Sequence, residues 1–166
     1  MTVSQRAVYD VMVFFQWATL PADKPHRIHG TLRALIDRDI RLCMSKASLE
    51  EVRRVLTDME LRLDYPSLTP SRVATILDRA LEYSDWFESV PDVFSLSGHT
   101  KDDHLFNLAI EANARYLVTF EKRILLLQNG KTTDALQLRK LAPTLRILNP
   151  PALAQVLKGR RSRHFP

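Results

Sequence analysis

The sequence lacks three features that would point to a secreted or membrane protein. Its only cysteine, Cys43, excludes an intrachain disulfide and, between Leu42 and Met44, is interpreted as a small buried apolar residue. No apolar run approaches the roughly 18 residues that indicate a membrane span. The N-terminus, MTVSQRAVYD, lacks the basic-then-apolar order of a signal peptide. We therefore expect a cytoplasmic protein without a membrane segment.

The length and charge of the chain set further limits. With 166 residues, of which 45% are hydrophobic, the chain can form one domain with its own core, and we expect this domain to span residues 1–157. The net charge of +5 is compatible with a polyanionic partner. Much of the excess lies in KGRRSRH, which begins at Lys158, so residues 158–166 are interpreted as a basic, solvated C-terminal tail.

Apolar periodicity alternates along the chain between strand-like and helix-like segments. Such alternation predicts an α/β fold with a parallel sheet. One predicted helix, capped by Ser45 or Ser48 and continuing through Met59, has a buried stripe that includes Met59. The segment 85–96 mixes aromatic residues with a proline and receives no assignment. Strands are expected at 6–9, 40–44, 116–120 and 145–148, and further helices at 29–37, 69–81, 103–112, 121–128, 132–141 and 152–157.

The most informative segment is KDDHLFNLAIEANARYLVTFEK, residues 101–122, which reads as a helix followed at once by a short strand. Acidic residues stand at both ends of this unit. In an open α/β sheet, the carboxyl ends of strands and the starts of the following helices face one crevice. The order of the elements therefore predicts that Asp103 and Glu121 converge there.

Two further acids are expected at the same crevice. Asp10 directly ends the first strand within an apolar context, where burying an ionised group costs several kcal/mol unless it is paired. Glu51 lies in the helical register of Val55, so it is expected to point partly inward. Four such acids could hold one or two Mg²⁺ or Mn²⁺ ions, and the natural reaction is phosphodiester hydrolysis.

Each acid also has an ordinary structural interpretation. An Asp at the end of a strand is commonly a helix cap, and Asp102 is interpreted in that way. Glu51 alone is compatible with a solvated helix residue, and Glu121 with a first-turn acid favoured by the helix dipole. The joint placement of the acids is what favours a metal site.

Four segments together give the chain a resemblance to a known family. They are a strand ending in Asp10, then SKASLEEVRRVL, KDDHLFNLA and ARYLVTFEKRILL. This order resembles the PIN-domain proteins, in particular the VapC-like toxins of toxin–antitoxin systems, over about residues 7–157. The resemblance implies a three-layer α/β/α sandwich around a central, mostly parallel sheet. It also implies a metal-dependent ribonuclease that uses Mg²⁺ or Mn²⁺, acts on RNA, is regulated by a small antitoxin protein and often forms a homodimer.

The resemblance also implies roles for individual residues. Asp10, Glu51, Asp103 and Glu121 match the family's acids, and Asp10, Asp103 and Glu121 are the implied metal ligands. Thr119 matches a small polar residue of the later strand, which either hydrogen-bonds a carboxylate or a water, or simply packs.

Some positions depart from the family pattern. Met12 replaces a usual Asn, Arg123 replaces a usual acid, and Phe120 and Glu121 replace a usual Gly-Asp pair. His99 and Thr100 also stand where many relatives carry Asp-Pro. These departures leave open a second interpretation, a non-catalytic PIN-like module that binds RNA or protein, for which a buried guanidinium paired to Asp10 or Asp103 would be the mark.

Overall fold

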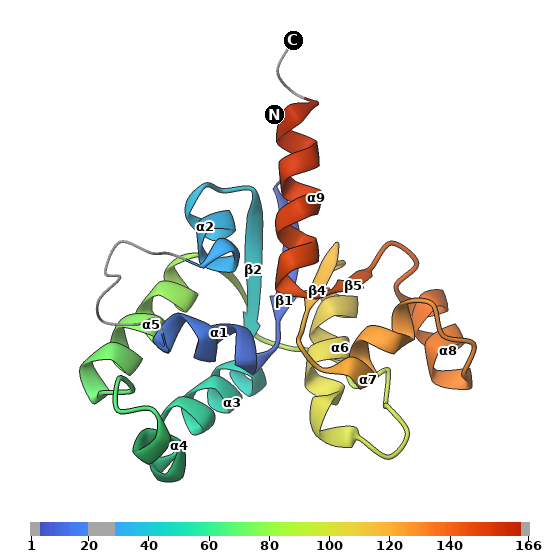
Figure 1. Ribbon diagram of the computed structural model, residues 1–166. Helices are drawn as coiled ribbons and strands as arrows, with labels where there is room; N and C mark the ends of the chain where they lie inside the picture. Colours follow the sequence, from blue (N-terminus) through green and yellow to red (C-terminus); the bar gives the residue numbers. More distant parts are fainter. Residues whose placement is uncertain (1–3, 20–28, 164–166) are drawn as a thin grey trace.

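A five-stranded, entirely parallel sheet forms the middle layer of the molecule (Figure 1). The computed structural model describes residues 4–19 and 29–163. The order of the strands across the sheet is β3-β2-β1-β4-β5. Their bounds are β1 Gln5–Tyr9, β2 Ile40–Ser45, β3 Ser84–Phe87, β4 Tyr116–Val118 and β5 Arg146–Leu148. The predicted fold class is therefore confirmed.

Helices cover both faces of the sheet, as Figure 1 shows with the sheet near its edge. The helices of the first face are α1 Val11–Ala18, α2 Gly30–Ile36, α3 Lys46–Leu56, α5 Pro70–Glu82 and α9 Pro150–Ser162. Those of the second face are α6 Asp103–Glu111, α7 Lys122–Leu125 and α8 Thr133–Leu141. Shorter pieces are α4 Met59–Asp64, η1 Thr100–Asp102 and η2 Leu126–Gln128.

The two faces form two separate hydrophobic cores because successive side chains of a strand point to opposite sides. In β1, Ala7 and Tyr9 belong to the core under α1 and α2, whereas Val8 belongs to the core under α6. All three side chains are almost fully buried. The central strand is therefore covered on both faces, as is usual in a parallel sheet.

Parallel strands bring their carboxyl ends to one edge of the sheet, and the connections reverse direction between β1 and β4. β2 and β3 lie on one side of β1, and β4 and β5 lie on the other. Such a reversal opens a crevice beyond the strand ends, and ligands of α/β proteins commonly bind there. The residues that follow β1 and β4 are Asp10 and Thr119.

Side-chain caps start the helices near this edge at the positions expected from the sequence. Ser45 caps α3 in a reciprocal capping box with Ser48. Thr69 caps α5 by accepting from the backbone N–H of Arg72, with Pro70 at the first helical position. These caps fix where the chain enters the helices that flank the crevice.

The predicted helix through Met59 is confirmed up to Leu56 and was wrong only in its last three residues. α3 ends at Leu56, and a new helix, α4, begins at Met59. Asp58 caps α4 by accepting from the backbone N–H of Leu61 at 3.0 Å. Met59 is consequently 79% exposed and does not belong to a buried stripe. The competing cap at Asp58 is the physical reason for the break.

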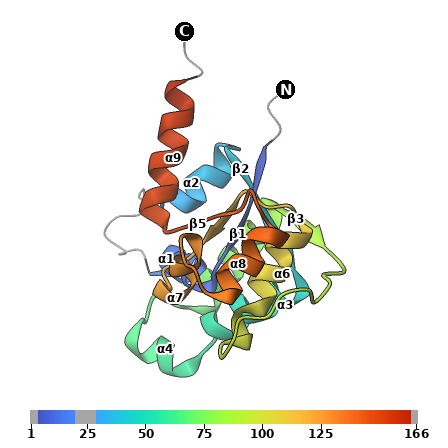
Figure 2. The same ribbon diagram turned by 90° about the vertical axis from the view of Figure 1, so that its right-hand side faces the viewer.

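The segment from Lys158, expected as a solvated tail, is mostly exposed in its described part, but it is helical because α9 continues to Ser162. Figures 1 and 2 show α9 projecting past the end of the sheet. Arg161 pairs with Asp37 and Asp39 at the end of α2, and Arg160 donates to the side chain of Gln5 at 2.6 Å. These contacts hold the basic residues in helical order.

The unassigned segment 85–96 contributes the edge strand β3, followed by a chain without regular structure that packs Phe94 and Leu96 into the second core. No helix within residues 4–19 and 29–163 combines the length and the apolar composition that crossing a bilayer requires.

Candidate active site at the carboxyl edge of the sheet

Asp10 is the buried acid at the centre of the crevice. It follows β1 directly and occupies the N-cap position of α1, and it is 9% exposed. Its Oδ1 accepts from the backbone N–H of Val11 at 2.7 Å. Its own backbone N–H donates to the carbonyl of Val118 at 2.9 Å, which extends the pairing of β1 with β4. The carboxylate is therefore fixed by the sheet and the helix together.

Thr119 supplies the second hydrogen bond to this carboxylate. Its side chain is fully buried, and its hydroxyl donates to Oδ2 of Asp10 at 2.7 Å. The same hydroxyl oxygen accepts from the backbone N–H of Glu121 at 3.0 Å. Of the alternatives that the sequence left open for Thr119, the bond to a carboxylate is the one that the structure contains. It links the ends of β1 and β4 into one rigid unit.

Burial raises the pKa of Asp10 above its ordinary value, because desolvation disfavours the charged form. The hydrogen bonds from Thr119 and Val11 act in the opposite direction. The negative charge of Asp102 raises the pKa further, and the charge of His104 lowers it. Asp102 and His104 therefore lie within electrostatic reach of Asp10.

Asp102 was expected to cap the following helix, and this expectation was wrong. It stands at the N-cap position of α6, but it has αR backbone angles and its side chain makes no capping hydrogen bond. The chain reaches α6 through the 3₁₀ turn η1, so Asp102 is already helical and cannot adopt the extended geometry of a cap. Its half-buried carboxylate has no hydrogen-bond or ion-pair partner among the described residues.

Asp103 begins α6 as expected, but one of its oxygens has a structural role. Oδ1 of Asp103 accepts from the backbone N–H of Leu96 at 2.8 Å. Asp103 also lines a cavity of about 320 Å³, together with Ser45, His104 and Asn107. This cavity lies at the end of β2 and the start of α6. Asp103 therefore faces the crevice while it holds the loop that enters α6.

Asn107 fixes the opposite wall of this cavity. It is 5% exposed, and its Oδ1 accepts from the backbone N–H groups of Val93 and Phe94, each at 2.9 Å. Its amide nitrogen donates to Asp92 and to the carbonyl of Phe94. All of its hydrogen-bonding capacity is used, so Asn107 shapes the crevice and is not a free ligand.

The geometry of His104 fixes its tautomer when the ring is neutral. Nδ1 lies 3.0 Å from the carbonyl oxygen of Lys101. Because a carbonyl only accepts, Nδ1 carries the hydrogen, which leaves Nε2 as an acceptor. His104 is thus a basic group whose charge acts on Asp10 and lowers its pKa.

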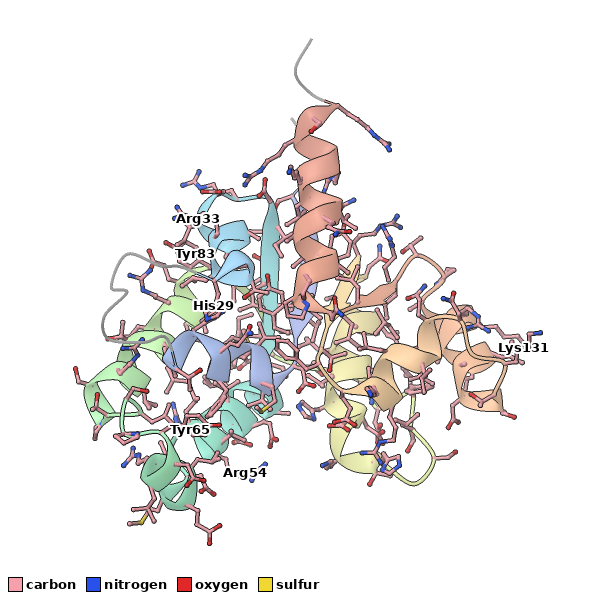
Figure 3. All side chains as sticks on the ribbon, viewed as in Figure 1. His29, Arg33, Arg54, Tyr65, Tyr83 and Lys131 are labelled. Carbon is pink, nitrogen blue, oxygen red and sulfur yellow. The ribbon has the colours of Figure 1, made fainter. Side chains whose placement is uncertain are left out.

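Glu51 is engaged on its own helix. Arg54 holds both oxygens of Glu51, with Nη2 at 2.8 Å from Oε1 and 3.0 Å from Oε2. Figure 3 shows Arg54 below the main body of α3, on the side of α4. No hydrogen bond joins Glu51 to Asp10 within the described residues, so Glu51 flanks the crevice and is held by its own arginine.

Glu121 is connected to Asp10 through its backbone, not through its carboxylate. Its N–H reaches the hydroxyl of Thr119, whereas its side chain, about half exposed, pairs with Arg123 at 3.5 Å. The guanidinium of Arg123 also contacts the imidazole of His99. Arg123 therefore turns toward Glu121 and His99, and no guanidinium pairs with Asp10 or Asp103 in the described parts of the chain.

Two apolar side chains flank the crevice in the open. Met12 is 42% exposed and Phe120 is 40% exposed. Phe120 directly follows Thr119 in sequence, and Met12 follows Asp10 by two residues. Exposed large apolar groups beside a buried carboxylate are suited to contact a ligand.

The donor set fits one hard cation held by few protein ligands. Across the described residues, no three Asp, Glu, His or Cys side chains gather closely enough to enclose a metal ion as they stand. Asp10 and Asp102 nevertheless provide two carboxylates with no cationic side chain paired to them. Mg²⁺ is commonly bound in proteins by one or two carboxylates together with waters and substrate phosphates.

Sequence reasoning gave too little weight to Asp102 and His104 as neighbours of Asp10. Their placement depends on η1, a single 3₁₀ turn, which rotates the side chains of residues 100–102 relative to a regular helix. The paired acids at 102 and 103 were the available signal, and periodicity could not say which of the two faces Asp10.

The comparisons with known proteins agree with this architecture. The model of the PIN domain matches residues 6–123, well over half of the chain, and this segment contains Asp10, Glu51, Asp102, Asp103 and Glu121. No curated protein matches the sequence. The PIN domain is generally a nuclease fold, and PIN nucleases typically use divalent metals. On the extent of that match, together with the parallel sheet and its acidic crevice, the chain belongs to the PIN-domain family.

Proposed function

We propose that the protein is a metal-dependent endoribonuclease that hydrolyses RNA phosphodiester bonds at the carboxyl edge of its sheet. One observation carries the proposal. Asp10 is a buried carboxylate with the charge of Asp102 nearby and with no cationic side chain paired to it. Without a ligand, burial and the nearby negative charge oppose the ionisation of Asp10. A bound cation would offset this cost and stabilise the ionised carboxylate.

The same observation argues against the non-catalytic alternative. A degenerate site would be expected to neutralise its buried acid with a guanidinium. Arg123, the residue at issue, instead pairs with Glu121 and contacts His99. The negative charge of Asp10 and Asp102 therefore stays available to a ligand.

We assign the ligand roles as follows. Asp10 and Asp102 would hold Mg²⁺ or Mn²⁺, and Asp103 would contribute the oxygen that Leu96 leaves free. The bound ion would activate a water and stabilise the charge that develops on the phosphate. Glu51 and Glu121 would join only after release from Arg54 and Arg123.

The remaining residues would position the reactants. Thr119 would keep Asp10 in one orientation, since its hydroxyl bonds one carboxylate oxygen and a backbone N–H at once. Nε2 of His104, the free acceptor of the neutral ring, would accept or relay a proton at the crevice. Phe120, exposed beside Thr119, would stack on an unpaired base of single-stranded RNA.

The proposal is tested by cleavage of an end-labelled RNA with Mn²⁺ and with EDTA. We expect Asp10→Asn and Asp102→Asn each to lower the Mn²⁺-dependent rate by at least about a hundredfold, because even partners of metal ligands cost 10- to 100-fold. Asp78→Asn, on the exposed face of α5, makes the same change elsewhere and should leave the rate unchanged. Cleavage that survives in Asp10→Asn, or that proceeds equally in EDTA, would contradict the assignment.

Asp102 and Asp103 are separated by measuring stability together with activity. Asp103→Ala removes the acceptor for Leu96 and should lower both the unfolding free energy and the rate. Asp102→Ala should lower the rate alone, because Asp102 has no side-chain hydrogen bond to lose. The reverse pattern would assign the ligand role to Asp103, as the family resemblance implies.

We further propose that the enzyme is the toxin of a toxin–antitoxin pair. The resemblance to VapC-like toxins supports this, and the exposed Met12 and Phe120 offer an apolar rim that an antitoxin segment could cover. A homodimer is proposed on the same resemblance. A small open reading frame beside the gene, whose purified product inhibits cleavage, is the expected finding. A gene without such a neighbour, or a product that does not inhibit, would contradict the toxin role.

A further inference from the structure

The amino edge of the sheet, opposite the crevice, carries a basic groove. Two cavities of about 710 Å³ and 510 Å³ lie there and share Gln5 and Arg115 as lining residues. We call the pair of cavities the amino-edge groove. Its arginines come from the starts of three strands and from α9, and they are Arg6, Arg115, Arg146, Arg160 and Arg163.

The arginines of the groove are only partly satisfied by the protein. Arg146 and Arg163 are exposed, and their guanidinium groups have no hydrogen-bond or ion-pair partner among the described residues. Arg115 donates to the carbonyl of Thr144 at 3.0 Å, but its Nε is buried without a partner. A buried donor left unpaired is costly, and it is a group that an anion could satisfy.

The groove offers little negative charge in return. Among the described residues that line the two cavities, one is acidic, and it is Asp85. It is already paired with Arg6 at 3.2 Å and with Arg41 at 2.7 Å. The field of Arg115, Arg146 and Arg163 is therefore not cancelled within the groove.

We propose that the amino-edge groove binds the phosphate backbone of single-stranded RNA, as a second contact for the nuclease proposed above, on which this inference rests. Arginine is suited to this role because its planar fork donates two parallel hydrogen bonds to a phosphate. Two contiguous cavities fit an extended chain of phosphates better than one small anion. The amide groups of Asn113 and Gln155 line the groove and can meet base edges.

The position of the groove gives it a function distinct from cleavage. It is separated from Asp10 by the length of β1, five residues or about 17 Å at the usual rise of a strand. An RNA that occupies both edges must pass around the sheet. The groove would therefore increase the affinity for longer substrates without touching the scissile phosphate.

The test measures RNA binding in EDTA, where no metal-dependent cleavage occurs. The probe is a fluorescein-labelled single-stranded RNA of mixed sequence, followed by anisotropy over about 50 to 200 mM salt. The variant is Arg146→Glu with Arg163→Glu, two exposed side chains without partners whose change should leave the fold intact. The control is Arg79→Glu with Lys131→Glu, which makes the same change in net charge on α5 and in the turn before α8, where Figure 3 shows Lys131.

We expect the groove variant to raise the Kd for RNA about tenfold and to flatten the slope of log K against log salt by about 1.4, the loss of two phosphate contacts on a single strand. The control should bind like the parent protein. Equal binding by the two double variants would overturn the inference, since net charge alone would then explain the affinity. Displacement of the labelled RNA by poly-glutamate at a lower concentration than by unlabelled RNA would overturn it in favour of an acidic protein partner.

The outcome is independent of the proposed catalytic function. If the groove is not an RNA site, the groove variant and the charge-matched control bind and cleave RNA alike while Asp10→Asn remains inactive. If the nuclease proposal fails, no variant cleaves RNA with Mn²⁺, yet the difference in binding between groove variant and control persists.

Discussion

Asp10 and Asp85 are the same residue type near opposite edges of one sheet, and the protein shifts their pKa values in opposite directions. Burial raises the pKa of Asp10, and no cation is paired with it. At Asp85, burial acts in the same direction, but hydrogen bonds and charges from Arg41 and Arg6 outweigh it and lower the pKa. The two edges therefore differ in the partners of their acids more than in the acids themselves.

The difference assigns separate chemistry to the two edges. At the carboxyl edge, negative charge is left without a protein cation, which favours binding of a metal. At the amino edge, positive charge is in excess and the acid is neutralised, which favours binding of phosphate. The two proposals, cleavage of RNA at the carboxyl edge and binding of RNA at the amino edge, both depend on this difference in charge.

The largest change in stability and in the pKa of Asp10 should come from removing the hydroxyl of Thr119. Thr119→Val keeps the shape of the side chain but leaves a buried carboxylate without its donor, so we expect the unfolding free energy to fall by about 1–3 kcal/mol. The pKa of Asp10 should rise further, and the pH dependence of cleavage should move upward with it. Urea denaturation and a pH–rate profile measure both. Thr119→Ser, which keeps the hydroxyl, is the control, and equal behaviour of the two variants would refute the role of the bond.

Asp10→Asn should have a smaller effect on stability, of the opposite sign. Because the folded pKa of Asp10 lies above its ordinary value of 3.8, the folded state binds more protons than the unfolded state between these two values. The unfolding free energy then falls as pH rises through that interval. Asp10→Asn removes this loss of unfolding free energy. At pH 7 the variant should therefore have a higher melting temperature than the parent, whereas below pH 3.8 the variant should gain no stability over the parent in this way. A variant less stable than the parent at pH 7 would show that Asp10 is not strained.

Asp85→Asn should give a still smaller effect of the other sign. The folded pKa of Asp85 is lowered, so its ion pairs stabilise the fold above the ordinary pKa and are lost as pH falls through the folded value. Since Asp85 and its partners are partly exposed, we expect a loss of at most about 1 kcal/mol at pH 7. Chemical denaturation at two pH values checks this. A greater loss at low pH than at pH 7 would contradict the assigned direction.

Cys43, in the middle of β2 between the two edges, should show the smallest response. Burial raises the pKa of its thiol to about 12. A thiol reagent at pH 8 should therefore leave the native protein unmodified and react only as the protein unfolds. Variants at either edge should change the rate of modification only as far as they change stability. Rapid modification of the native parent would place Cys43 outside the core.

The order of elements was predictable because it depends on local signals. Alternation of periodicity gave a parallel sheet, and Ser45 and Thr69 marked helix starts through their capping side chains. What failed depended on competition between signals. Asp58 caps a new helix that begins at Met59, so the preceding helix ends earlier than predicted. The contacts of Arg161 with Asp37 and Asp39 keep helical a segment whose composition indicates a solvated tail.

The candidate site was predictable to the extent that it follows strand ends. Asp10 and Thr119 end neighbouring strands, and the structure joins them by a hydrogen bond. The spacing of Asp102 and Asp103 could not show which of them acts on the pKa of Asp10, because a 3₁₀ turn precedes α6 and changes their placement relative to a regular helix. The sequence also could not show whether Glu51 points inward or pairs with Arg54, because its position in the helix is compatible with either orientation.

The central claim is that the carboxylates of Asp10 and Asp102 form a metal site, and calorimetric titration of Mn²⁺ tests it without any assumption about substrate. The parent protein, the Asp10→Asn, Asp102→Asn double variant and the Asp78→Asn control are titrated under the same conditions. The account predicts saturable binding to the parent and the control, and none to the double variant. Equal binding by all three proteins, or none by the parent at millimolar Mn²⁺, would contradict it.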